Sequence, residues 1–127
     1  MTRYNPLRAP DPKEWSAMDE QERMRLVEQF HRRAGIRLPN AKVHAVIHAV
    51  VETQIALGDE IPVRRTLERL MSEGLDRHDA IHAIGWVFTL QISDLVSRPD
   101  IVSTTDPNES YYAALERLTA EDWLQSG

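Results

Sequence analysis

Apolar side chains recur at helical spacing along most of this chain. Positions three and four residues apart form four apolar stripes, which begin at Met24, Val43, Val63 and Ile81. Residues at this spacing share one face of an α-helix, so each stripe predicts an amphipathic helix with one buried side. The chain shows no alternation of strand and helix patterns, no Gly-rich phosphate loop and no repeat of fixed period. The pattern therefore favours an all-α fold.

Capping residues place the ends of the predicted helices. Asp19, Asn40 and Asp76 are suitable N-caps, Pro62 suits a first helical position, and glycines follow several of the stripes. The predicted helices span residues 20–34, 41–57, 62–73, 77–96 and 107–118, and a final turn carries Trp123. Residues 1–11 are predicted to be an extended N-terminal arm and residues 97–109 a loop. We expect one domain, residues 1–127, folded as a compact bundle of five to six helices with short connections.

Composition excludes several classes of function. The 127 residues include no cysteine, so disulfides, thiolate metal sites and cysteine nucleophiles are absent. A net charge of −5 argues against a dedicated nucleic-acid binder. The apolar runs are shorter than the roughly 18 residues of a membrane span. We expect a cytoplasmic protein that binds neither nucleic acid nor membrane, and no sequence feature identifies a small-molecule substrate.

Four of the five histidines form two pairs with a spacing of four residues, His44/His48 and His78/His82. Residues four apart on a helix have Cβ atoms about 5–6 Å apart, so both rings of a pair can hold one cation. Each pair shares its helix face with apolar residues and follows closely after an N-cap. If the helix 62–73 reverses the chain between them, the two histidine-bearing helices run parallel and bring four imidazoles together.

Two carboxylates lie near these pairs in the sequence. Glu52 continues the row of the first pair and is a candidate fifth ligand, whereas Asp79 is a candidate outer-shell acceptor that fixes a ring tautomer. Nitrogen-rich ligation suits Zn, Ni, Cu or Fe better than Mg or Ca. The remaining histidine, His31, lies next to two arginines and is expected to be exposed or at the boundary of the core.

Two other interpretations remain open. The same histidines could form a buried polar network in a non-catalytic interaction or scaffold module, which could be a homodimer. Alternatively, the chain resembles the HD-type metal phosphohydrolases, which are all-helical enzymes, at His48, His78-Asp79 and either Asp94 or Asp100. That resemblance leaves the second member of each pair without a role.

A longer pattern resembles a bacterial family of small helical proteins classified as a domain of unknown function. The pattern runs Asn40-x3-His44-x3-His48-x5-Gln54, then Asp59 and Pro62, then His78-Asp79-Ala80-x-His82. The family pattern is N-x3-H-x3-H, then E-Q, an Asp shortly before a Pro, and H-[DE]-A-x-H. The similarity covers about residues 40–95, although Glu52 stands two positions before Gln54 instead of beside it. This resemblance implies a helical fold and a shared histidine site, and it implies no particular activity.

Overall fold

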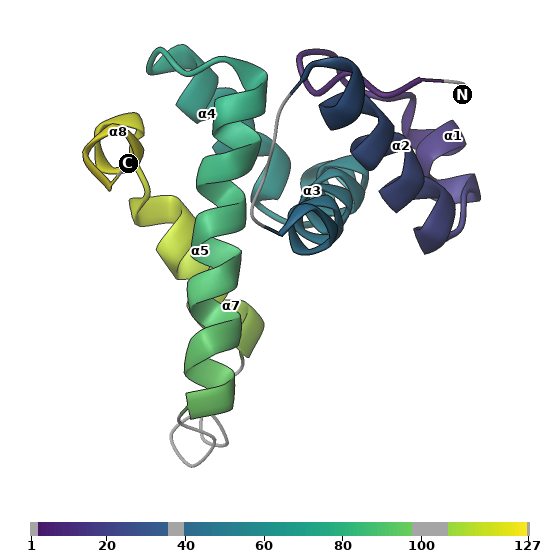
Figure 1. Ribbon diagram of the computed structural model, residues 1–127. Helices are drawn as coiled ribbons and strands as arrows, with labels where there is room; N and C mark the ends of the chain where they lie inside the picture. Colours follow the sequence, from purple (N-terminus) through teal and green to yellow (C-terminus); the bar gives the residue numbers. More distant parts are fainter. Residues whose placement is uncertain (1–2, 36–39, 98–106, 127) are drawn as a thin grey trace.

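The computed structural model describes residues 3–35, 40–97 and 107–126. Within these ranges the elements are α1 (Pro12–Ala17), α2 (Glu20–Arg33), α3 (Ala41–Ala56), the 3-10 turn η1 (Gly58–Glu60), α4 (Val63–Ser72), α5 (Arg77–Ser97), α7 (Pro107–Arg117) and α8 (Ala120–Ser126). These helices pack against one another, and the described ranges contain no strand (Figure 1). The prediction of a compact all-α bundle is confirmed.

The predicted N-caps hold the starts of the helices. Asn40 Oδ1 accepts the backbone N–H of Val43 at 3.2 Å, and Asp76 Oδ1 accepts the backbone N–H of Asp79 at 2.7 Å. Asp19 caps α2 in the same way. These bonds satisfy donors that the first turn of a helix leaves without a partner. The five longer helices begin and end within one residue of their predicted bounds.

The segments predicted to lack helix lie at the margins of the fold. Residues 3–11 are non-helical and close over the core, where the Tyr4 side chain is only 1% exposed. The predicted loop 97–109 falls mainly on residues 98–106, which lie outside the described residues. Its two ends, Ser97 and residues 107–109, belong to α5 and α7.

The buried apolar side chains form two clusters. The larger cluster joins α3, α4, α5, α7 and α8 and includes Val51, Leu70 and Ile84. The smaller cluster joins the N-terminal arm, α1, α2 and α3 and includes Trp15 and Leu26. Because α3 contributes to both clusters, it is the central helix of the bundle.

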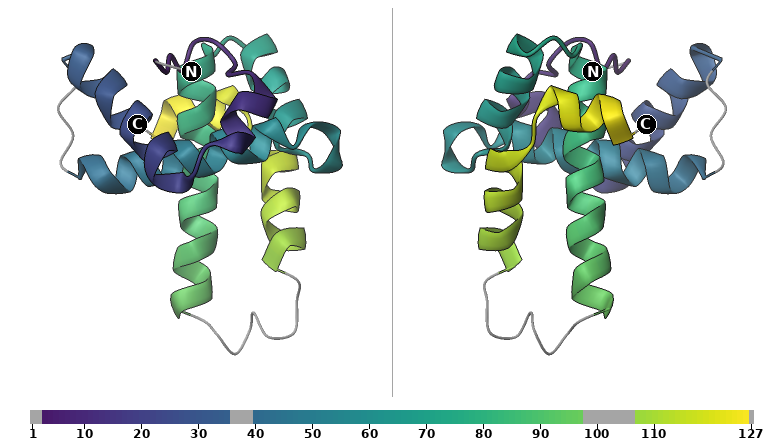
Figure 2. Two further views of the ribbon diagram at one scale, coloured as in Figure 1. Left: turned by 90° about the vertical axis from the view of Figure 1, so that its right-hand side faces the viewer. Right: turned by 90° about the vertical axis from the view of Figure 1, so that its left-hand side faces the viewer.

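The two helices that carry the histidine pairs cross. Figure 2 shows α3 running across α5, so the prediction that these helices are parallel is wrong. They meet at Gly85, where an added Cβ would lie 2.6 Å from Ile47 Cγ2. A single residue without a side chain permits close approach at one point, whereas parallel packing needs matched ridges along both helices. Ile47 directly precedes His48, and His82 lies three residues before Gly85, so both pairs still lie beside the crossing.

By length and composition alone, α5 is apolar enough to cross a membrane, and it is the one such helix in the described chain. Its first half supplies Ala80, Ile81 and Ile84 to the larger cluster. Its second half extends with α7 beyond the rest of the fold and exposes Ile92 and Val96 (Figure 2). Core packing therefore accounts for the apolar composition of the first half.

Replacing Gly85 with Ala is expected to destabilise the fold, although Ala favours a helix interior over Gly by about 1 kcal/mol. The added methyl group must displace Ile47 or separate α3 from α5, and such overpacking costs about 1–3 kcal/mol. Urea denaturation should show a net loss in the free energy of unfolding. In the Gly85→Ala background, Ile47→Ala should cost less than it does alone. Strictly additive effects of the two changes would contradict the close contact.

Candidate functional site

All five histidines of the chain meet in one cluster. One ring nitrogen from each side chain lies within 4.8 Å of the corresponding atom of every other, and the members are His31, His44, His48, His78 and His82. The structure thus brings the four histidines of the predicted pairs together. It adds His31, which is only 5% exposed, so the expectation of an exposed or boundary position for this residue is wrong.

The Nε2 atoms of the five rings follow one another at short range. The separation is 3.1 Å from His31 to His44 and 3.1 Å from His44 to His82. It is 3.0 Å from His82 to His48 and 3.2 Å from His48 to His78. The rings therefore direct the same nitrogen toward one common point.

The structure orients the His31 ring through its other nitrogen. His31 lies in the last turn of α2, and its Nδ1 lies 2.8 Å from the backbone oxygen of Val27. A carbonyl oxygen only accepts hydrogen bonds, so Nδ1 carries the hydrogen. In the neutral ring, Nε2 then has a free lone pair directed into the cluster.

The His48 ring is oriented by a buried chain of side chains. The Tyr4 hydroxyl donates to Glu52 Oε2 at 2.5 Å and lies 3.1 Å from His48 Nδ1. Because its hydrogen goes to the carboxylate, the Tyr4 oxygen accepts from His48 Nδ1–H. Burial, followed by the charge of Glu52, raises the pKa of Tyr4 well above its usual value, so the phenol keeps this hydrogen. The Nε2 of His48 therefore also has a free lone pair.

Glu52 lies behind His48 and is paired with Arg77. Both Arg77 terminal nitrogens donate to the carboxylate at 2.7 Å. The Glu52 side chain is 0% exposed and the Arg77 side chain is 5% exposed. Arg77 also donates to the backbone oxygen of Pro6 at 2.9 Å, which ties the N-terminal arm to α5. Glu52, which was predicted as a fifth ligand, thus bonds Arg77 and Tyr4. Tyr4 in turn bonds His48, so Glu52 acts on the ring through Tyr4.

Asp79, predicted as an outer-shell acceptor, is exposed in the first turn of α5. Its backbone N–H bonds to the Asp76 side chain. The acceptors that orient rings of the cluster are instead the Val27 carbonyl oxygen and the Tyr4 hydroxyl.

The environment favours the neutral form of the four histidines of the two pairs. Burial, and then the neighbouring rings, lowers the pKa of His44 to about 4 and that of His82 to about 3. The same causes lower the pKa of His48 further, and burial followed by His31 lowers the pKa of His78. Neutral imidazole is the form that ligates metals. The cluster is compatible with a bound metal ion or with a network of neutral histidines.

Arg77 and Tyr4 were not predicted from the sequence as parts of the site, and His31 was predicted to be less buried than it is. His31 follows Val27 by one helical turn on the buried face of α2, a signal that its neighbouring arginines obscured. Arg77 directly precedes the second histidine pair, but a buried arginine has no pattern of its own. Tyr4 lies in the non-helical arm, 44 residues from His48, and no local signal links the two.

The residues of the HD-type resemblance are only partly brought together. His48 and His78 meet in the cluster. Asp94 lies 16 residues beyond His78 on the same helix, which is about 24 Å along the helix axis. Asp100 lies outside the described residues.

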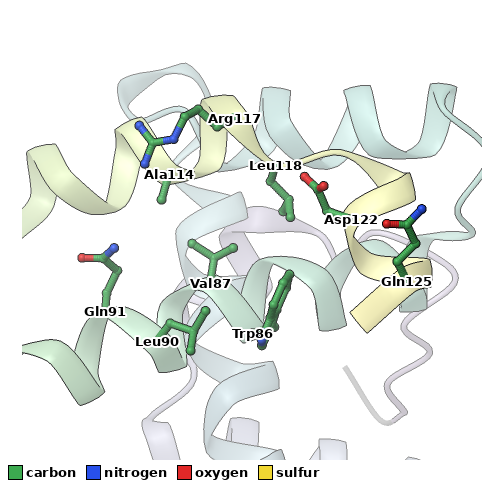
Figure 3. Close-up of a pocket in the computed structure, with 9 residues that line it drawn as sticks. All are labelled: Trp86, Val87, Leu90, Gln91, Ala114, Arg117, Leu118, Asp122 and Gln125. Atoms are coloured by element: carbon green, nitrogen blue, oxygen red, sulfur yellow. The ribbon is translucent and has the colours of Figure 1, made fainter. Parts of the chain in front are cut away.

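A separate hollow lies between the second half of α5 and the helices α7 and α8 (Figure 3). Its volume is about 440 Å³, and Trp86, Leu90 and Leu118 line its apolar part while Arg117 and Asp122 lie at its side. The Trp86 ring is 6.1 Å from Trp123, whose ring is 6.4 Å from His82. No histidine lines this hollow, and a series of ring contacts through Trp86 and Trp123 runs from its lining to His82.

The Glu52→Gln variant should lose about 3–5 kcal/mol of unfolding free energy, because it leaves the buried Arg77 charge without its counter-ion. Urea denaturation at neutral pH measures this loss. Glu68→Gln is the matched control, since the ion pair of Glu68 with Arg64 is exposed, and it should change stability little. Equal effects of the two variants would contradict the role of the buried pair.

The metal-free protein should lose stability as the pH falls below about 6.5. The folded-state pKa values of about 4 for His44 and about 3 for His82 lie below the unfolded value of 6.5, so the unfolded chain binds more protons between them. This stabilising contribution is complete above about pH 6.5 and declines as the pH falls toward 4. Urea denaturation with a chelator at several pH values measures it. The variant His44→Gln/His82→Gln should show a shallower decline between pH 6.5 and 5, and an unchanged slope would contradict the assignment.

Comparison of the chain with protein-family models, with curated proteins and with solved structures finds no match. The function of the histidine cluster therefore has to be inferred from the chemistry of its own residues.

Proposed function

We propose that this protein binds one divalent transition-metal ion through the Nε2 atoms of His31, His44, His48, His78 and His82. The observation that carries the proposal is the set of four Nε2–Nε2 separations of 3.0–3.2 Å. Imidazole nitrogens bind zinc at about 2.0–2.1 Å, so neighbouring ligands around such an ion lie about 2.9–3.4 Å apart. The observed separations agree with those of ligands that share one ion.

Hydrogen bonding alone does not explain these separations. A neutral imidazole Nε2 either donates one hydrogen or accepts with one lone pair. A string of five such nitrogens can be joined by two ordinary hydrogen bonds at most, whereas four short contacts are present. The His31 and His48 tautomers also place lone pairs in the cluster. The metal-free polar network of a scaffold module would leave the other contacts without a bond, which is costly in a buried site.

The donor set favours particular metals. Five neutral nitrogens without a carboxylate or thiolate suit Ni, Cu, Fe or Zn rather than Mg or Ca. Structural zinc sites are almost always four-coordinate. A fifth imidazole therefore favours Ni, Cu or Fe(II) over a structural zinc site.

Elemental analysis of protein purified without a His-tag, before and after reconstitution with Ni, Cu, Zn or Fe(II), tests the proposal. We expect one ion per chain and, at a free metal concentration of about 1,000 times Kd, a gain of about 4 kcal/mol in unfolding free energy. His31→Ala and His82→Ala should each weaken metal affinity at least tenfold.

Asp94→Asn is the control for these variants, because Asp94 is distant from the cluster along α5. It should retain metal binding unchanged, whereas an HD-type site that used Asp94 would lose affinity. Folded protein that takes up none of the four metals would overturn the proposal in favour of the buried polar network. Light scattering of the same samples tests whether the chain forms the homodimer considered for a scaffold module.

A further inference from the structure

The His48 ring has a special place among the five. Its centroid lies 5.2 Å from that of His31, 4.9 Å from His44, 5.0 Å from His78 and 5.0 Å from His82. His48 therefore contacts every other ring of the cluster.

The other four rings form a closed circuit. The centroid distances are 4.6 Å for His31/His44, 4.7 Å for His44/His82, 4.3 Å for His82/His78 and 5.7 Å for His78/His31. Among these five fully described histidines, the pairs without a ring contact are His31/His82 and His44/His78, which lie across the circuit from each other. The four rings thus form a square with His48 at its apex.

This pattern distinguishes two five-coordinate geometries. A trigonal bipyramid has one pair of ligands on opposite sides of the metal, whereas a square pyramid has two such pairs that share no member. The cluster has two opposed pairs, His31/His82 and His44/His78, and an apex that contacts all four. The arrangement is that of an octahedron with one corner missing, opposite His48.

Building on the proposed function, we infer that the bound metal has an open sixth coordination position opposite His48 and that this position takes a small monodentate anion. His48 is 1% exposed and forms the floor of the cluster. His44, His78 and His82, whose rings are all in the square, are half-buried residues. The missing corner therefore lies on the outer side of the cluster, away from the buried floor.

The charge balance of the site favours an anionic ligand. Imidazole ligates a metal in its neutral form, so five such ligands leave the charge of a divalent ion uncompensated. Glu52 is neutralised by Arg77 and lies behind His48, on the side away from the open position. Asp76 and Asp79 act on His78 from the exposed start of α5, where water screens them.

The hydrogen-bonded side chains of Tyr4 and Glu52, which orient His48, also affect the ligand on the opposite side of the metal. Hydrogen bonding of Nδ1–H to a partner that is itself bonded to a carboxylate makes the imidazole a stronger donor. A strong donor weakens the bond to the ligand on the opposite side of the metal, which keeps that ligand exchangeable. Tyr4 is thus a positioning residue for both the metal and its sixth ligand.

Titration of the Co(II)-loaded protein with sodium azide, followed by visible absorption and by NMR, tests the open position. Azide should change the Co(II) spectrum in a saturable way with one azide per metal. All five histidines should keep their paramagnetically shifted ring N–H signals, because the anion fills a free position and displaces no ring. Metal content is measured again after the titration.

The outcomes separate the two proposals. Protein that takes up no Co(II) or other transition metal contradicts the proposed function itself. Protein that holds one metal, but whose spectrum azide leaves unchanged or whose histidine signals azide removes, overturns the open position alone.

Tyr4→Phe locates the open position relative to His48. The variant removes the acceptor of His48 Nδ1–H, so metal affinity should fall about 10–100-fold. Azide affinity of the loaded variant should rise several-fold, because the opposite donor is weaker. Tyr112→Phe, which removes a tyrosine hydroxyl from α7, is the matched control and should change neither metal affinity nor azide affinity. Unchanged or weaker azide binding in Tyr4→Phe would overturn the assignment opposite His48.

Discussion

The histidine site depends on how closely α3 approaches α5. At Gly85 there is no space for a side chain, since a Cβ would lie 2.6 Å from a methyl group of Ile47. This contact lies within three residues of both His48 and His82 and therefore sets the distance between the two pairs. Crossing helices separate quickly on either side of such a point, so the rings near the crossing meet while residues farther along α5 do not. The relative position of the two histidine pairs follows from this close packing contact.

Five imidazoles at such short range constitute an unusual concentration of polar groups in a small core. Burial favours the neutral form of four of these rings by lowering the pKa of His44, His48, His78 and His82. Neutral rings with their lone pairs directed inward are poor partners for one another and good ligands for a cation. The same desolvation that makes the metal-free cluster costly thus favours the metal binding proposed above.

The N-terminal arm completes the site from outside the helical bundle. Tyr4 bonds His48 and Glu52, and Arg77 holds both Glu52 and the backbone of Pro6. Three distant segments therefore share one buried hydrogen-bonded chain, whose members are individually expensive to bury and are each satisfied by the next. This chain fixes the tautomer of the most buried histidine, and it links the position of the arm to the electronic properties of the site.

The sequence by itself determined the five longer helices, their caps and the pairing of four histidines. These features depend on residues within a few positions of one another, namely apolar spacing, Asn40 and Asp76 as caps, and the four-residue spacing of His44/His48 and His78/His82. Only the tertiary structure decided that α3 crosses α5, that His31 is buried with the pairs, and that Glu52 bonds Arg77 and Tyr4. Those outcomes depend on side chains 13 to 48 residues apart and on the space left by a single glycine. Local periodicity indicates on which face of its own helix each side chain lies, but it does not indicate the angle at which two helices meet.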